Sequence, residues 1–187
     1  MRIISGQYKG KRLIAPKNLP VRPTTDMAKE SLFNILNNRY YFQNIRILDL
    51  FSGTGNISYE FASRGATDIT SVDKSVQCIK FIKKTISELS FETQINIIKS
   101  DVFNFLKNHS LSYDIIFADP PYDFSEDQLF MISDIIFQKK ILSKDGALII
   151  EHSPYRQFKD HSNFIETKKY GGICLSFFSN KCSSESI

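Results

Sequence analysis

The residues whose types best suit a chemical step are four consecutive ones, Asp119, Pro120, Pro121 and Tyr122, here called the Asp119–Tyr122 turn. They follow an apolar run, 113–118, which predicts a buried strand that ends at Asp119. Two prolines cannot continue a ladder of backbone hydrogen bonds, so the chain must leave the sheet there. Open α/β sheets bind ligands beyond the carboxyl ends of their strands. A carboxylate, a rigid carbonyl-bearing turn and an aromatic ring at that place suit a flat heterocycle that carries an amine.

The amine of such a heterocycle is conjugated with its ring and is a poor nucleophile. Hydrogen bonds from the amine to the Asp119 carboxylate and the Pro120 carbonyl would draw its lone pair out of conjugation and orient the nitrogen. Tyr122 can stack on the base, which contributes on the order of 1–3 kcal/mol. A base inside a helix would first be flipped out, at roughly a few kcal/mol. Asp119, Pro120 and Tyr122 are therefore the candidate catalytic residues, and a plain proline turn with a buried Tyr122 is the less favoured interpretation.

A second motif begins at Asp49, which ends the apolar run 45–50 and precedes Gly53 and Gly55. The glycines let the backbone turn tightly and leave room for a ligand beside the main chain. A dinucleotide-binding turn would need a third glycine, and Ser58 occupies that position. An acid ahead of the glycines disfavours a pyrophosphate and favours a cation, such as the ammonium of a methionine moiety. Taken alone, this motif is matched about equally well by a plain strand-to-helix turn.

Two more acids follow the next two predicted strands. A carboxylate at Asp73 can accept hydrogen bonds from both hydroxyls of a ribose. Asp101 can face an adenine amino group, or it can simply cap the following helix. Acids at three successive strand ends would contact the amine, the ribose and the adenine of S-adenosylmethionine (AdoMet), which is the expected cofactor. The candidate cofactor-binding residues are Asp49, Phe51, Gly53, Gly55, Asp73, Asp101 and Asp119.

The elements that must position these residues alternate between strand and helix. The sequence predicts strands at 45–50, 68–72, 95–98, 113–118 and 146–150, and helices at 27–36, 55–64, 74–89, 101–108 and 125–138. That alternation is typical of a parallel sheet with helices on both faces. Residues 164–170 and 173–178, separated by two glycines, predict an antiparallel hairpin. The expected fold is α/β and Rossmann-like, with a mostly parallel seven-stranded sheet and a C-terminal antiparallel hairpin.

Composition limits the possible classes of protein. The 187 residues are 42% hydrophobic and 24% charged, as in ordinary globular domains. The three cysteines and three histidines lack the spacing of a disulfide framework or a metal site, so no metal and a reducing, cytoplasmic location are expected. No stretch of the sequence is apolar enough to span a membrane, and the N-terminus lacks the apolar core of a secretory signal.

Four segments of the chain resemble the RsmD-type family, the bacterial 16S rRNA guanine-N2 methyltransferases. The first two, residues 2–13 (RIISGQYKGKRL) and 22–33 (RPTTD followed by the helix through ESLF), are the ones that single out this family. The other two, residues 49–55 and the Asp119–Tyr122 turn, are shared by many amino-methyltransferases. The late Tyr170-Gly-Gly hairpin also fits. Two departures are Ser5, where members often have glycine, and Asp73, where glutamate is frequent.

The resemblance implies a class I AdoMet-dependent methyltransferase that acts on a guanine in 16S rRNA. The implied substrate is a partly or fully assembled small ribosomal subunit, and the expected protein is a monomer. We expect a small N-terminal hairpin extension at 1–23 that contacts RNA, a methyltransferase domain at 24–180 and a polar tail at 181–187.

The basic character of the chain belongs to its N-terminal segment. The net charge is +4, and residues 1–22 contain six basic residues and no acid, whereas the rest has 18 basic and 20 acidic residues. Such a segment suits contacts with RNA phosphates, although a charge run is usually just a solvated face. The candidate RNA-contacting residues are Arg2, Tyr8, Lys9, Lys11 and Arg12, with Arg22 and Thr25 added from their placement alone.

Three alternatives remain open at this point. A DNA adenine-N6 or cytosine-N4 methyltransferase shares the amine chemistry, but such enzymes usually need a recognition domain for which this chain has little room. A nicotinamide-dependent oxidoreductase is disfavoured by Ser58. A ribosome assembly factor without catalysis is disfavoured by the intact Asp119–Tyr122 turn.

Overall fold

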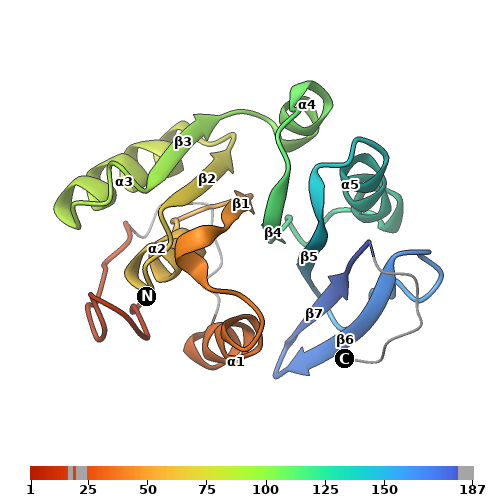
Figure 1. The fold of residues 1–187 in the computed structure, drawn as a ribbon, viewed down its shortest axis with the longest axis horizontal. Coiled ribbons are helices and arrows are strands. Elements are labelled where there is room, and N and C mark those ends of the chain that lie inside the picture. Colours follow the sequence, from red (N-terminus) through yellow and green to blue (C-terminus); the bar gives the residue numbers. More distant parts are fainter. Residues whose placement is uncertain (17–18, 20–24, 181–187) are drawn as a thin grey trace.

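A computed structural model describes residues 1–16, 19 and 25–180. Within these residues seven strands form one sheet, in the order β3-β2-β1-β4-β5-β7-β6 (Figure 1). The first five strands in that order are parallel, and β7 runs antiparallel to both of its neighbours. The strands are β1 (Arg46–Leu50), β2 (Asp68–Asp73), β3 (Ile95–Lys99), β4 (Tyr113–Ala118), β5 (Leu142–His152), β6 (Phe164–Tyr170) and β7 (Ile173–Phe178). The Rossmann-like prediction and its C-terminal antiparallel hairpin are confirmed.

The helices also lie close to their predicted positions. They are α1 (Asp26–Asn37), α2 (Asn56–Ser63), α3 (Val76–Glu88), α4 (Val102–Asn108) and α5 (Glu126–Gln138), with a short 3-10 helix at Phe42–Asn44. One boundary matters for the site: α3 is capped by Ser75 and begins at Val76, so Lys74 precedes the helix that was predicted to contain it.

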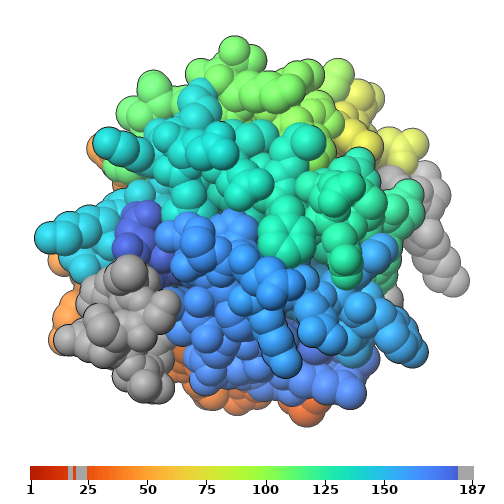
Figure 2. Space-filling view, turned by 90° about the vertical axis from the view of Figure 1, so that its right-hand side faces the viewer, coloured from red at the N-terminus to blue at the C-terminus, as the bar shows by residue number. Residues whose placement is uncertain are grey.

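Side chains alternate along the central strands, so apolar residues point to both faces of the sheet. Each face is covered by its own hydrophobic cluster. On β1, Ile47 belongs to one hydrophobic cluster, together with α1, α2, α3 and the N-terminal segment. Leu48 and Leu50 belong to the other, together with α4, α5 and Phe158. Beyond β5 the sheet continues into the C-terminal hairpin, so that β6 is its last strand. The hairpin and α5 form the continuous surface seen in Figure 2. The polar ends of the central strands are thus left as the place for a ligand.

The N-terminal segment folds back on itself and docks on the domain. Arg2 and Arg12 form an antiparallel bridge, although neither side of the hairpin is long enough to be a regular strand. The amide of Gln7 donates to the carbonyl of Ser63 at the end of α2 (2.7 Å). Gly6 has a φ of +82°, and a Cβ there would lie 1.8 Å from the Ser63 oxygen, so the close approach requires glycine. The expected hairpin is present, packed against α2.

Candidate active site

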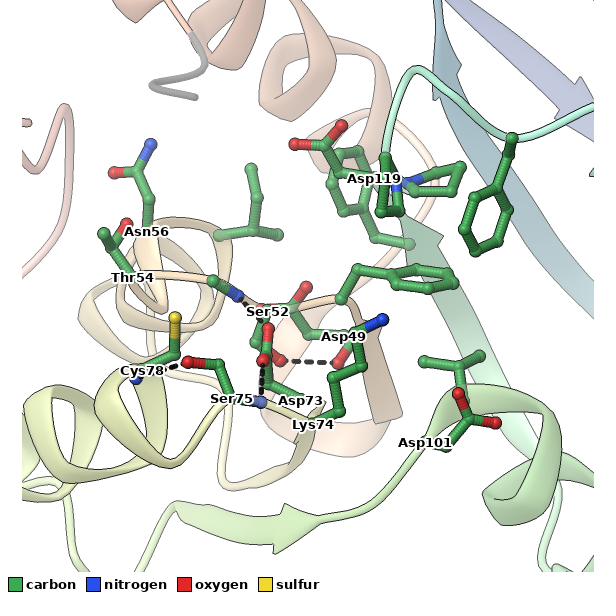
Figure 3. Close-up of a pocket in the computed structure, with 18 of the residues that line it drawn as sticks. Asp49, Ser52, Thr54, Asn56, Asp73, Lys74, Ser75, Cys78, Asp101 and Asp119 are labelled. Atoms are coloured by element: carbon green, nitrogen blue, oxygen red, sulfur yellow. Dashed lines mark hydrogen bonds between the residues drawn. The ribbon is translucent and has the colours of Figure 1, made fainter. Parts of the chain in front are cut away.

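A cavity of about 420 Å³ opens at the carboxyl ends of the central strands (Figure 3). It brings together residues from β1, from the glycine turn, from the end of β2, from the start of α4 and from the Asp119–Tyr122 turn. Of the residues proposed from sequence as catalytic or cofactor-binding, all but one line it: Asp49, Phe51, Gly53, Asp73, Asp101, Asp119, Pro120 and Tyr122. The exception, Gly55, caps the start of α2.

Asp49 lies deepest, on β1, and its side chain is buried. One carboxylate oxygen accepts a hydrogen bond from Ser58 Oγ at 2.5 Å, and Ser58 is itself 2.7 Å from Ser71 Oγ. Burial raises the pKa of Asp49 to about 7. The hydrogen bond from Ser58 opposes that rise, whereas the nearby negative charges of Asp119 and Asp73 add to it. Position 58, where a dinucleotide site would need glycine, therefore holds a serine that orients this acid.

The turn between β1 and α2 is built from backbone conformations that few side chains tolerate. Phe51 has a φ of 58°, which is strained for a residue with a side chain. Gly55 has a φ of +78°, and a Cβ there would lie 2.7 Å from the ring of Tyr59. Phe51, Gly53 and Thr54 of this turn line the cavity, so the turn forms part of its wall.

Asp73 ties the glycine turn to the next loop. Its two carboxylate oxygens accept from the amide of Gly53 (2.8 Å) and from the amide of Ser75 (2.7 Å), as Figure 3 shows. An ionised carboxylate can accept about four hydrogen bonds, so the two sites used here leave room for ligand hydroxyls. The structure gives Asp73 a role in shaping the turn that sequence analysis had not considered.

Asp101 fits both interpretations considered for it. Its side chain accepts from the amide of Asn104 at 3.1 Å, which makes it the N-cap of α4. It also lines the cavity, at the end opposite the glycine turn's helix in Figure 3. The cap fixes one oxygen of the carboxylate and so orients the side chain.

The Asp119–Tyr122 turn leaves β4 at the cavity rim, and the amide of Asp119 donates to the carbonyl of Leu50 on β1 (3.3 Å). The ring of Tyr122 is about a third exposed (36%). It is therefore not the buried core residue of the less favoured interpretation, and it lies where a base could reach it.

Several lining residues were missed by sequence analysis. Phe124 lines the cavity and packs edge-on against Phe51, which also lines it (ring centroids 5.6 Å apart). Phe103 stacks on Phe124 from outside the cavity (6.1 Å) and supports it there. Lys74 and Cys78 also line the cavity. The sequence carries no signal for Phe124, because a phenylalanine in a loop is more often buried in the core.

The candidate RNA-contacting residues differ in their surroundings. Lys9, Lys11 and Arg12 are exposed on the hairpin, whereas Arg2 pairs with Asp26 (3.1 Å). Tyr8 is held in place, since its hydroxyl donates to the carbonyl of Leu89 (2.7 Å) and its ring packs edge-on against Phe91. Thr25 caps α1 by accepting from the amide of Ala28, and Arg22 lies outside the described residues.

A buried ion pair that sequence analysis did not foresee links the hairpin to the cavity. Lys29 on α1 and Glu60 on α2 are both fully buried and lie 3.2 Å apart. Burial lowers the pKa of Lys29, and the charge of Glu60 opposes that shift. Glu60 also accepts from the amides of Ile4 and Ser5, so the pair joins three parts of the chain.

The described part of the chain contains neither a metal cluster nor a membrane-spanning helix. There, no group of three or more histidine, cysteine, aspartate or glutamate side chains is arranged to hold a metal ion. Nor does any described helix combine the length and apolar character needed to cross a membrane.

The comparison with protein families decides the assignment. Residues 1–179 match the family model described as "Conserved hypothetical protein 95". The chain belongs to this family, the RsmD-type family.

Relatives of this RsmD-type chain carry corresponding names. It is 34% identical to "Putative rRNA methyltransferase YlbH" of Bacillus subtilis over 155 residues. This aligned region covers 81% of this chain and 82% of the relative. It is also 34% identical over 169 residues to "Ribosomal RNA small subunit methyltransferase D" of Buchnera aphidicola subsp. Acyrthosiphon pisum, covering 89% and 85%. The solved structure "Putative methyltransferase yhhF from Escherichia coli" superposes with a TM-score of 0.82 over 98% of this chain and 99% of that one, at 23% identity.

Proposed function

We propose that the protein transfers the methyl group of AdoMet to the exocyclic N2 amine of a guanine in 16S rRNA. The observation that carries the proposal is the convergence of the predicted residues on one cavity, with the Asp119–Tyr122 turn at its rim. The relatives named as rRNA methyltransferases support RNA as the acceptor.

The residues that line the cavity fit AdoMet. Its size is within the range of ligand pockets, and its wall combines aromatic rings with carboxylates. AdoMet carries a sulfonium and an ammonium, both of which favour an environment rich in acids, and its sulfonium supplies an electrophilic methyl group. Asp49 would hold the ammonium, Asp73 the ribose hydroxyls and Asp101 the adenine amine.

The Asp119–Tyr122 turn would bind the guanine that accepts the methyl group. The Asp119 carboxylate and the Pro120 carbonyl accept hydrogen bonds from the guanine amine and turn its lone pair toward the methyl group. Tyr122 stacks on the flipped base. Asp119 orients the amine and need not be a strong base, because the nitrogen becomes acidic only after the methyl group is transferred.

The N-terminal segment would supply the contacts with RNA. Lys9, Lys11 and Arg12 are exposed on one small hairpin, where they suit phosphates. We propose that the substrate is a partly or fully assembled small subunit, that the protein acts as a monomer and that it works in the cytoplasm.

Radioactive transfer from labelled AdoMet to small subunits that lack the modification tests this function. Asp119→Ala should abolish transfer while AdoMet still binds, because Asp119 acts on the amine. Asp123→Ala is the matched control, since Asp123 is an exposed acid in the same loop that does not line the cavity. Full activity of Asp119→Ala would contradict the mechanism, and methylation of duplex DNA but not of ribosomal particles would favour the DNA alternative.

A further inference from the structure

Asn56, the first residue of α2, lines the cavity beside Thr54 (Figure 3). Its Oδ1 accepts a hydrogen bond from Lys29 Nζ at 2.9 Å. An ammonium can only donate, so this contact fixes which end of the amide is oxygen and which is nitrogen. The Nδ2 donor is therefore turned away from Lys29, and it makes no hydrogen bond with any described residue.

Lys29 is held rigidly at this place. Its side chain is fully buried, and Nζ also donates to the carbonyl of Arg2 (2.6 Å) and pairs with Glu60 (3.2 Å). Glu60 in turn accepts from the side chain of Arg64 (2.8 Å). A buried polar network whose members are all satisfied has little freedom to rearrange. The amide of Asn56 is thus fixed before any ligand arrives.

This edge of the cavity favours negative charge, unlike the part of the wall that is formed by Asp49 and Asp73. Lys29 and Arg64 share the single acid Glu60, so one positive charge is in excess. The edge also lies at the positive end of α2, whose cap residue, Gly55, has no side chain to satisfy the helix. Asp49 and Asp73, by contrast, have their carboxylates bound to Ser58, Gly53 and Ser75.

The ligand of the proposed function carries one group that matches this edge. In AdoMet the ammonium and the carboxylate are attached to the same carbon, so their binding partners must be close neighbours. Asp49, the proposed partner of the ammonium, is hydrogen-bonded to Ser58, which lies on the same first turn of α2 as Asn56. The two groups of the methionyl moiety can therefore be bound side by side, by Asp49 on β1 and by Asn56 at the start of α2.

We propose that the Asn56 amide, oriented by Lys29, binds the methionyl carboxylate of AdoMet. This inference rests on the proposed function, since it names a contact within the same site. Lys29 is a positioning residue: it acts through Asn56, and its contact with Arg2 also makes the subsite depend on the docking of the N-terminal segment.

The test compares the dissociation constants of AdoMet and decarboxylated AdoMet, measured by calorimetry. The second ligand keeps the sulfonium, the amine and the adenosine but lacks the carboxylate. Asn56→Ala should weaken AdoMet binding about tenfold, as expected for one hydrogen bond to a charged group, and leave decarboxylated AdoMet unchanged. Asn56→Asp should reverse the preference, because its second oxygen would repel a carboxylate and attract the remaining amine.

Controls separate this role from a structural one. Asn96→Ala removes an exposed amide from β3, outside the cavity, and should change neither constant. Lys29→Met keeps Asn56 but removes the residue that orients it. The preference for AdoMet, measured as the dissociation constant of decarboxylated AdoMet divided by that of AdoMet, should therefore fall. If Lys29→Met does not fold, Glu60→Gln tests the same edge with the opposite sign. It removes the acid shared by Lys29 and Arg64, so the preference for AdoMet over decarboxylated AdoMet should increase. Equal weakening of both ligands by Asn56→Ala would overturn the inference, and a wild type that binds neither ligand would overturn the proposed function as well.

Discussion

The ionisation of Asp49 depends strongly on the fold. It is buried on β1, with Ser58 as its hydrogen-bond donor, and its pKa is raised to about 7. In the unfolded chain the same carboxyl would have its ordinary value near 3.8. The folded protein therefore keeps a proton between these two pH values that the unfolded chain has lost.

That difference predicts how Asp49→Asn changes stability with pH. The contribution of Asp49 to stability is fully present below about pH 4 and is lost as the pH rises from about 4 to about 7. Over that range the unfolded chain has released a proton that the folded protein must keep, which favours the unfolded state. The variant escapes this loss, so its advantage over wild type should grow between pH 4.5 and pH 8, by at most about 4 kcal/mol. Urea unfolding at both pH values measures the advantage, and Asp123→Asn is the exposed control. An advantage that does not change with pH would contradict the assigned pKa.

Tyr122 provides a second prediction at the scale of one residue. Tyr122→Ala should lower kcat/KM on small subunits by roughly ten- to a hundredfold, because stacking on the base contributes on the order of 1–3 kcal/mol. Tyr122→Phe should keep most of the activity, since the ring is what stacks. Steady-state kinetics on both variants, with AdoMet saturating, distinguishes them. Equal loss in both would assign the effect to the hydroxyl and not to stacking.

Among the elements, the N-terminal hairpin depends on Gly6 for its docking. Gly6→Ala should lower the melting temperature and expose residues 1–16 to proteolysis, because the added Cβ would overlap the Ser63 carbonyl. Gly10→Ala is a matched control: its φ of +84° causes a similar backbone strain, but no atom lies within 4 Å of the added Cβ. Thermal melts and limited proteolysis compare the two. Equal destabilisation would show that strain, and not the contact with α2, is what matters.

The elements were largely predictable from sequence, and so were the residues at their ends. Apolar runs that end at Asp49, Asp73 and Asp119 locate strands, and parallel strands bring such ends to one edge. The partners of these acids were not predictable. Lys29 looks like a solvent-facing lysine on an amphipathic helix, and its contact with Glu60 spans 31 residues of sequence. Contacts of that kind depend on how helices pack, which no local pattern encodes.

At the scale of the whole molecule, the net positive charge belongs to one end of the chain. The remainder carries slightly more acids than bases, so binding to RNA should depend on the hairpin. The logarithm of the association constant for RNA falls as the logarithm of the salt concentration rises. Changing Lys9, Lys11 and Arg12 together to alanine should make this slope less steep by about two to three.

The matched control for this prediction changes Lys80, Lys83 and Lys84, three exposed lysines of α3, to alanine. Binding of labelled rRNA or small subunits at several salt concentrations gives the slopes. If the α3 variant lost as much slope as the hairpin variant, the RNA contact would be spread over the surface and the hairpin would have no special role.

The central claim is that this cavity methylates the N2 amine of a guanine in 16S rRNA, and the identity of the product tests it most directly. Small subunits that lack the modification are incubated with the protein and AdoMet that carries a deuterated methyl group, and the rRNA is digested to nucleosides for mass spectrometry. We predict deuterated N2-methylguanosine with wild type and with Asp123→Ala, and none with Asp119→Ala. A labelled methyladenosine or methylcytidine, or labelled guanosine with Asp119→Ala, would contradict the account.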